Sequence, residues 1–149
     1  MEILADAKRL AQEYRALTGK PLGVTGEVAE FEAARILKLE LTAARQAGYD
    51  AIETVEGGTR TLQIKGRCLL PGCKPSQRLS RIDIKKEFDA VLMVLLDGSF
   101  DATAIYEAER AAIVAALTKP GSTARNVMGA LAVSKFKAIS RLRWRRPSP

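Results

Sequence analysis

Three polar residues stand within the stretch GYDAIETVEGGTRTLQIKGR, residues 48–67: Asp50, Gln63 and Lys65. A carboxylate and an amide oxygen are hard ligands, and they suit Mg²⁺ or Mn²⁺. A lysine beside such ligands can position an attacking water and stabilise charge on a phosphate. Together these side chains could hydrolyse a phosphodiester. The same residues also fit a plain β-hairpin that carries polar side chains on its solvent face.

The glycine pair at positions 57 and 58 predicts a hairpin turn between two short strands. A turn centred between the glycines places Asp50 opposite Lys65, and Ile52 opposite Gln63. Side chains alternate along a strand, so Asp50, Gln63 and Lys65 are expected to project from one face of the sheet. A slip of one residue would separate Asp50 from Lys65.

A second helix, expected from Thr25 to about Ala47, carries Glu27 in its first turn. On the sheet-facing side of that helix, Glu27 could supply another carboxylate to a metal site. An acid at a helix start also stabilises the helix dipole without any further function. Asp89, at the mouth of a predicted apolar strand from Phe88 to Leu96, is another candidate acid, although a strand-end role in solvation suits it better.

The hairpin and the helix opening at Gly26-Glu27 resemble the PD-(D/E)XK nuclease superfamily, which has the restriction-endonuclease-like fold. In that family an Asp on one strand is followed by an acidic-x-Lys motif on the next. The resemblance covers about residues 22–106. It implies a central mixed sheet, DNA cleavage that depends on Mg²⁺ or Mn²⁺, and a role in restriction, repair or mobile-element processing. The implied catalytic residues are Glu27, Asp50, Gln63 and Lys65, and the implied metal ligands are Glu27, Asp50, Gln63 and the Ile64 carbonyl.

The chain departs from the family pattern at Gln63, where Asp or Glu is usual and Gln is the variant of Mrr-like relatives. The substitution leaves the metal with one carboxylate fewer. An alternative therefore stays open, in which the same fold binds nucleic acid or a protein partner and is catalytically weak or inactive.

Positive charge is concentrated in two segments of the chain, whose formal net charge is +7. Residues 65–86 carry seven basic side chains and one acid, and residues 119–149 carry eight basic side chains and no acid. This concentration favours a polyanionic partner, DNA first and a membrane surface second, over a merely solvated loop and tail. The candidate nucleic-acid contacts are Arg67, Lys74, Arg78, Arg81, Lys135, Lys137, Arg141, Arg143, Arg145 and Arg146.

Several other kinds of site are excluded by composition. The chain has no histidine, so histidine-based nucleophiles and metal ligands are absent, and it has no phosphate-binding P-loop or GxGxxG motif. Its two cysteines, Cys68 and Cys73, are too few for a closed zinc site and suit a reducing compartment. No apolar run approaches the ~18 residues of a membrane span, and the first residues lack the order of a signal peptide. We therefore expect a cytoplasmic protein that is not a membrane protein, with a homodimer as an open possibility.

The expected architecture is α+β in three layers, with a central mixed sheet of about four strands flanked by helices. One domain of 149 residues is expected. Its expected parts are an N-terminal helix at 2–18, a nuclease-like core at 22–106, C-terminal helices at 107–142 and a basic flexible tail at 143–149.

Overall fold

The computed structural model describes residues 2–19, 22–42, 48–72, 77–119 and 130–148, and these residues form a six-stranded mixed sheet. The strands lie side by side in sequence order, with β3 and β4 parallel and every other neighbouring pair antiparallel. They are β1 (Glu40–Leu41), β2 (Ala51–Val55), β3 (Gly58–Cys68), β4 (Ala90–Leu96), β5 (Ala102–Glu109) and β6 (Arg141–Arg145).

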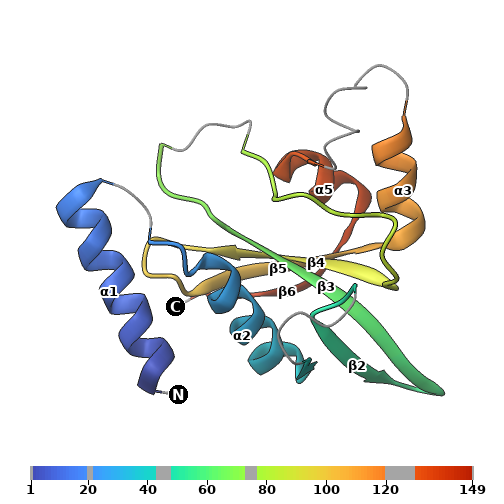
Figure 1. Cartoon of the computed structure of the whole chain (residues 1–149), viewed down its shortest axis with the longest axis horizontal. Coiled ribbons are helices and arrows are strands. Elements are labelled where there is room, and N and C mark those ends of the chain that lie inside the picture. The colour runs from blue at the N-terminus through green and yellow to red at the C-terminus, as the bar shows by residue number, and fades with distance from the viewer. Residues whose placement is uncertain (1, 20–21, 43–47, 73–76, 120–129, 149) are drawn as a thin grey trace.

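Helices cover both faces of the sheet (Figure 1). The helices α1 (Glu2–Thr18) and α2 (Thr25–Leu37) contribute to the core on one face, where Val28, Ala29 and Ala33 pack with Leu62 of β3. The helices α3 (Arg110–Thr118) and α5 (Val133–Ile139) contribute to the core on the other face. The predicted α+β class is therefore confirmed, but the sheet has two more strands than the four expected.

The central strand β4 was predicted well because every one of its residues is apolar. All seven of its residues are buried, since α-helical layers lie over both of its faces. Its neighbour β5 continues to Glu109, so the expected helical region at 107–142 begins later, at Arg110.

The C-terminal segment differs from the expected flexible tail. Residues Arg141–Arg145 form β6, which pairs antiparallel with β5, and Arg146 N–H donates to the Thr103 carbonyl oxygen. The helical region expected to reach residue 142 likewise ends earlier, at Ile139 of α5. Alternating basic and apolar residues in RLRWR carry the strand signal, which the high charge of the segment obscured.

Two helices also differ from the expected patterns. Helix α2 ends at Leu37, ten residues before the predicted end, where Lys38 adopts a left-handed conformation with φ of 57°. In α1, the apolar residues that recur at helical spacing lie largely outside: Ile3 is 83% exposed and Leu17 is 86% exposed, whereas Ala11 is buried. The body of the protein is contacted instead through the neighbouring row that includes Leu4 and Lys8. Among the residues that the structure describes, no helix combines the length and apolarity that membrane crossing requires.

Strand β3 has an open edge, which positions the candidate site. Its first half pairs with β2, and from Leu62 to Cys68 it pairs with β4 on the other side. Beyond Leu62, no strand of the described chain covers the β2 side of β3. Helix α2 crosses this region so closely that a Cβ on Gly66 would lie 2.5 Å from the Ala29 Cβ.

Candidate functional site

The three residues singled out in the hairpin meet at one small cavity. Asp50, Gln63 and Lys65 line a hollow of about 130 Å³ beside the start of β2, where β3 continues without a described strand on its β2 side. The remaining lining residues are Gly48, Tyr49, Arg81, Asp83 and Lys86.

The hairpin register that brings these residues together differs by two positions from the predicted register. Ala51 lies opposite Leu62, so the predicted pairing of Asp50 with Lys65 is wrong. The turn is centred one residue earlier than expected, because Gly57, with φ of 87°, is its second residue. A displacement of two residues leaves the faces unchanged, which is why the expected side chains still share one cavity.

Asp50 lies at the fork between the two strands. Its N–H donates to the Leu62 carbonyl oxygen at 2.8 Å, and its Oδ2 accepts the Ile64 N–H at 2.7 Å. Just before the start of β2, the Asp50 carboxylate therefore accepts the hydrogen bond from Ile64 N–H that a backbone carbonyl of a longer β2 would accept. In a strand, the N–H and the C=O of one residue point to the same side. The Ile64 N–H faces Asp50 at the open edge, so the Ile64 carbonyl faces that edge as well.

Gln63 is buried beside Asp50 and is held through its amide nitrogen. Its Nε2 donates to the Gly48 carbonyl oxygen at 2.9 Å, which leaves Oε1 as the atom that can accept another group. A glutamate in this position would lose the donated hydrogen bond. The local backbone is therefore matched to an amide rather than to the carboxylate usual in the resembled family.

Lys65 is partly buried in the same cavity. Burial lowers the pKa of its ammonium group, Asp50 opposes that effect, and the nearby positive charge of Lys86 adds to it. The resulting cation is poorly hydrated and lies among carboxylates, so it is suited to donating to an anionic oxygen.

The structure brings Glu30 of α2 toward this group, a residue that the sequence analysis missed. Burial raises the pKa of the Glu30 carboxyl, and the carboxylates of Asp50 and Glu27 raise it further, whereas Lys65 opposes them. Glu27 itself is exposed and does not line the cavity. The signal was available in the sequence, since Glu30 follows Glu27 by one helical turn and lies on a similar side of α2.

The candidate metal ligands are thus oxygens of mixed type. They are the Asp50 carboxylate, the Gln63 Oε1 and the Ile64 carbonyl, with the Glu30 carboxylate nearby on α2 but outside the lining of the cavity. Within the described ranges, no three His, Cys, Asp or Glu side chains gather closely enough to hold a metal ion by themselves. Oxygen donors of this kind match Mg²⁺ or Mn²⁺, and the amide and the backbone carbonyl must therefore take part in any such site.

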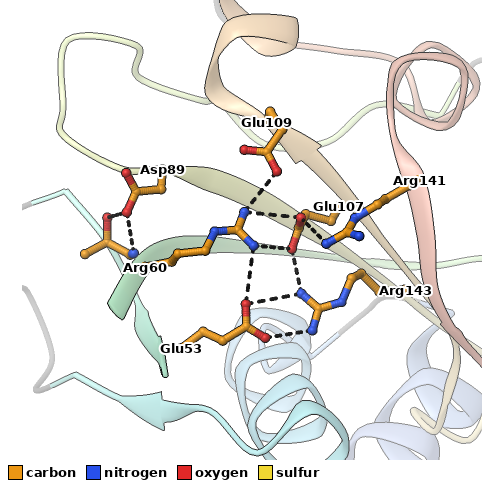
Figure 2. Close-up of polar contacts among 8 residues, drawn as sticks. Glu53, Arg60, Asp89, Glu107, Glu109, Arg141 and Arg143 are labelled. Carbon is orange, nitrogen blue, oxygen red and sulfur yellow. Dashed lines mark hydrogen bonds and ion pairs between the residues drawn. The ribbon is translucent and has the colours of Figure 1, made fainter. Parts of the chain in front are cut away.

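Asp89, the other candidate acid, has a structural role. Its Oδ2 accepts hydrogen bonds from the Thr61 N–H at 2.8 Å and from the Thr61 hydroxyl at 3.2 Å (Figure 2). These bonds tie the start of β4 to β3, so Asp89 acts at the strand end by accepting hydrogen bonds, whereas a role in solvation was expected there.

Two of the arginines predicted to contact nucleic acid are instead bound by carboxylates within the protein. Figure 2 shows Arg141 and Arg143 of β6 converging with Arg60 of β3 on the buried Glu107. The Arg143 Nη1 lies 2.6 Å from Glu107 Oε1, and its Nη2 lies 2.7 Å from Glu53 Oε2. This cluster compensates the charges of Arg141 and Arg143 and fastens β6 to the sheet.

Burial opposes the ionisation of Glu107, but hydrogen bonds from Arg143, Arg60 and Arg141 outweigh it and lower the pKa of Glu107 to about 2. Glu107 is therefore ionised at neutral pH although its side chain is fully buried.

The other predicted contacts fall into separate groups. Arg146 forms an ion pair with Asp97 at 2.8 Å, and Arg78 donates to the Ala130 carbonyl oxygen at 3.0 Å. On the α5 side of the sheet, the Lys137 ammonium lies 5.6 Å from the centre of the Tyr106 ring.

Lys135 and Arg145 lie on α5 and β6, away from the cavity that contains Asp50. Arg67 and Arg81 lie on or near the open edge of β3, while Lys74 lies outside the described residues.

No protein-family model matches this chain, and a search of curated proteins found no match to it.

Proposed function

We propose that this protein is a metal-dependent nuclease that hydrolyses phosphodiester bonds of DNA and has a restriction-endonuclease-like core. One observation carries the proposal: Asp50, Gln63 and Lys65 line a single cavity at the open edge of β3. The α+β architecture, with a mixed sheet between helical layers, is compatible with that fold.

A divalent metal fits the donor atoms of this cavity. Asp50, Gln63 Oε1 and the Ile64 carbonyl would hold Mg²⁺ or Mn²⁺ from the sheet, and Glu30 would approach from α2. Burial, followed by the carboxylates of Asp50 and Glu27, raises the pKa of Glu30, and a neighbouring cation would offset the repulsion between these acids. The metal would supply Lewis-acid stabilisation of the negative charge on the phosphate.

The protein's own groups would orient the reacting atoms. Lys65 would donate to a non-bridging phosphate oxygen or to the attacking water, and its burial strengthens that interaction. Asp50 would be held in place by its bond to the Ile64 N–H, so that its other carboxylate oxygen meets the metal. Exposed Glu27 would act at longer range, through water.

The test is cleavage of plasmid, linear and branched DNA by the purified protein in Mg²⁺ and in Mn²⁺. Lys65→Ala should abolish cutting, whereas the control Lys85→Ala removes the same charge from an exposed side chain outside the cavity and should cut normally. If no DNA is cut in either metal, or if Lys65→Ala cuts as well as the wild type, the proposal is wrong.

A second candidate function is a binding module of the same fold that does not cut. Two observations favour it: the Gln63 side chain is bound to Gly48, and the described residues hold no metal-binding group of three His, Cys, Asp or Glu side chains. DNA binding without metal-dependent cleavage would support this alternative.

A further inference from the structure

A larger groove lies next to the cavity, along the last residues of β3. Its volume is about 560 Å³, and it lies between the end of α1, the start of α2 and the loop that follows β3. Strand β3 contributes Gly66, Arg67 and Cys68, α1 contributes Arg15, and α2 contributes Thr25.

The groove lies where the described chain places no strand on the β2 side of β3, while β4 pairs with the other side. The Ile64 N–H points to the open side, so the peptide group of Gly66, two residues later, points the same way. The absence of a side chain at Gly66 lets α2 approach, with the Thr25 carbonyl oxygen 3.1 Å from the position that a Cβ would occupy. The backbone of Gly66 is thus one of the polar groups on the β2 side of β3 at this groove.

The two arginines of the groove carry charge that no carboxylate compensates. Within the part of the chain that the structure describes, neither Arg15 nor Arg67 forms an ion pair, and none of the groove's described lining residues is acidic. The Arg15 guanidinium lies 4.8 Å from the centre of the Phe100 ring. The Arg67 Nε donates to the Gln77 Oε1 at 2.5 Å, which leaves its terminal nitrogens available.

We propose that this groove binds the phosphodiester backbone of the nucleic-acid strand next to the bond that is cleaved, with Arg15 and Arg67 as the phosphate-binding residues. The proposal rests on the proposed function, because it extends the same substrate beyond the cavity. Lys65 and Arg67 lie on the same face of β3, and two residues along a strand advance about 6.6 Å. A phosphate backbone that contacts Lys65 can therefore also contact Arg67, and Arg15 of α1 can contact it from the other wall of the groove. Guanidinium groups bind phosphate oxygens through paired N–H donors.

The first test measures binding without cleavage. The probe is a fluorescently labelled DNA oligonucleotide, titrated by anisotropy in EDTA over a series of salt concentrations. Arg15→Gln and Arg67→Gln should each weaken binding and reduce the slope of log K against log salt by about one, because each removes one phosphate contact. Arg9→Gln is the matched control, since Arg9 is on the same helix but pairs with Asp6 at 3.2 Å. Unchanged slopes in the groove variants, or an equal change in Arg9→Gln, would overturn the proposal.

A second readout uses Cys68, a free, partly exposed cysteine in the wall of the groove. The chain has two cysteines, so Cys73→Ser leaves Cys68 as the sole thiol. The bound oligonucleotide should slow the reaction of Cys68 with a maleimide severalfold, and Arg15→Lys, which keeps the charge, should retain the protection. An unchanged rate would contradict the proposal. Equal protection by inorganic phosphate would also contradict it, since the groove would then be an ion site.

These measurements distinguish a failure of the groove proposal from a failure of the nuclease proposal. A protein that shows the slope changes and the Cys68 protection but cuts no DNA would overturn the nuclease proposal alone. A protein that cuts DNA, with binding unaltered by Arg15→Gln and Arg67→Gln, would overturn the groove proposal alone.

Discussion

The carboxylate of Asp50 is hydrogen-bonded to the main chain of Ile64, with 2.7 Å between Asp50 Oδ2 and the Ile64 nitrogen. One of its oxygens thereby accepts a backbone hydrogen bond of β3 just beyond the N-terminal end of β2. The other oxygen is left for the chemistry proposed at the cavity. Asp50 thus combines a structural and a functional role, and substitutions can separate the two.

Asp50→Asn should abolish cleavage while preserving the fold. Asparagine retains a side-chain oxygen that accepts the Ile64 N–H, but it lacks the charge that attracts a metal ion. We expect cleavage to fall by orders of magnitude and DNA binding to persist, as measured by gel assay and anisotropy. Asp50→Ala should in addition lose about 1–3 kcal/mol of stability, because the Ile64 N–H loses its acceptor. Metal-dependent cleavage by Asp50→Asn at the wild-type rate would refute the role of the charge.

Gln63→Glu should lower the stability of the metal-free protein and strengthen metal binding. A carboxylate cannot donate to the Gly48 carbonyl oxygen, so the metal-free variant should be less stable by about 1–3 kcal/mol. It also restores an acid to the candidate metal site, so Mn²⁺ should raise its melting temperature more than that of the wild type. Thermal unfolding with and without Mn²⁺ measures both effects. Equal shifts in the two proteins would argue against a metal at this position.

Gly66→Ala should destabilise the packing of α2 on the sheet. Its new methyl group would lie 2.5 Å from the Ala29 Cβ, so the helix must shift, at a cost of about 1–3 kcal/mol. Adding Ala29→Gly should recover part of the loss, and a double-mutant cycle in urea would quantify the coupling. Gly26→Ala is the control, because no atom lies within 4 Å of its added Cβ and helix propensity favours alanine. Additive effects of Gly66→Ala and Ala29→Gly would show that the contact is not tight.

Glu107→Gln should change how stability depends on pH. The folded pKa of about 2 lies below the unfolded value of 4.5, so the contribution of Glu107 is complete above pH 4.5 and is lost as the pH falls toward 2. The loss should approach about 3 kcal/mol in the wild type, and the stability difference between wild type and Glu107→Gln should shrink over this range. Urea unfolding at several pH values measures it. Glu109→Gln is the control and should change stability little at neutral pH, because its side chain is 63% exposed and exposed ion pairs contribute little.

Parts of the fold with a clear periodic pattern were predictable from the sequence. β4 was predicted because a short, wholly apolar run needs cover on both faces, and the hairpin because two glycines separate β-rich segments. β6 was missed because its stability comes from Glu107 and Glu53, which lie far away in the sequence. Local charge alone suggested a solvated tail, and only the tertiary contacts reveal that Arg143 is held within the protein.

The candidate site was predicted from which face of the sheet each side chain lies on, and an error in the strand register did not change that face. The prediction placed Asp50 two positions from its actual partner, yet the alternation of side chains kept it on the correct side. Helical spacing made Glu30 a candidate on the same side of α2 as Glu27, but its approach to Asp50 depends on how closely α2 crosses β3 at Gly66. That distance is set by packing between elements, which a single sequence does not specify.

The two outer strands of the sheet bear on how the protein behaves at high concentration. An exposed strand edge is a template on which another chain can add, and this is a route to aggregation. Here β1 is only two residues long, and β6 carries an arginine at every second position. An incoming strand would find little backbone to pair with at one border and would meet bulky, charged side chains at the other. The arrangement should therefore disfavour the addition of a further strand at β1 and at β6, the two borders of the sheet that the structure describes.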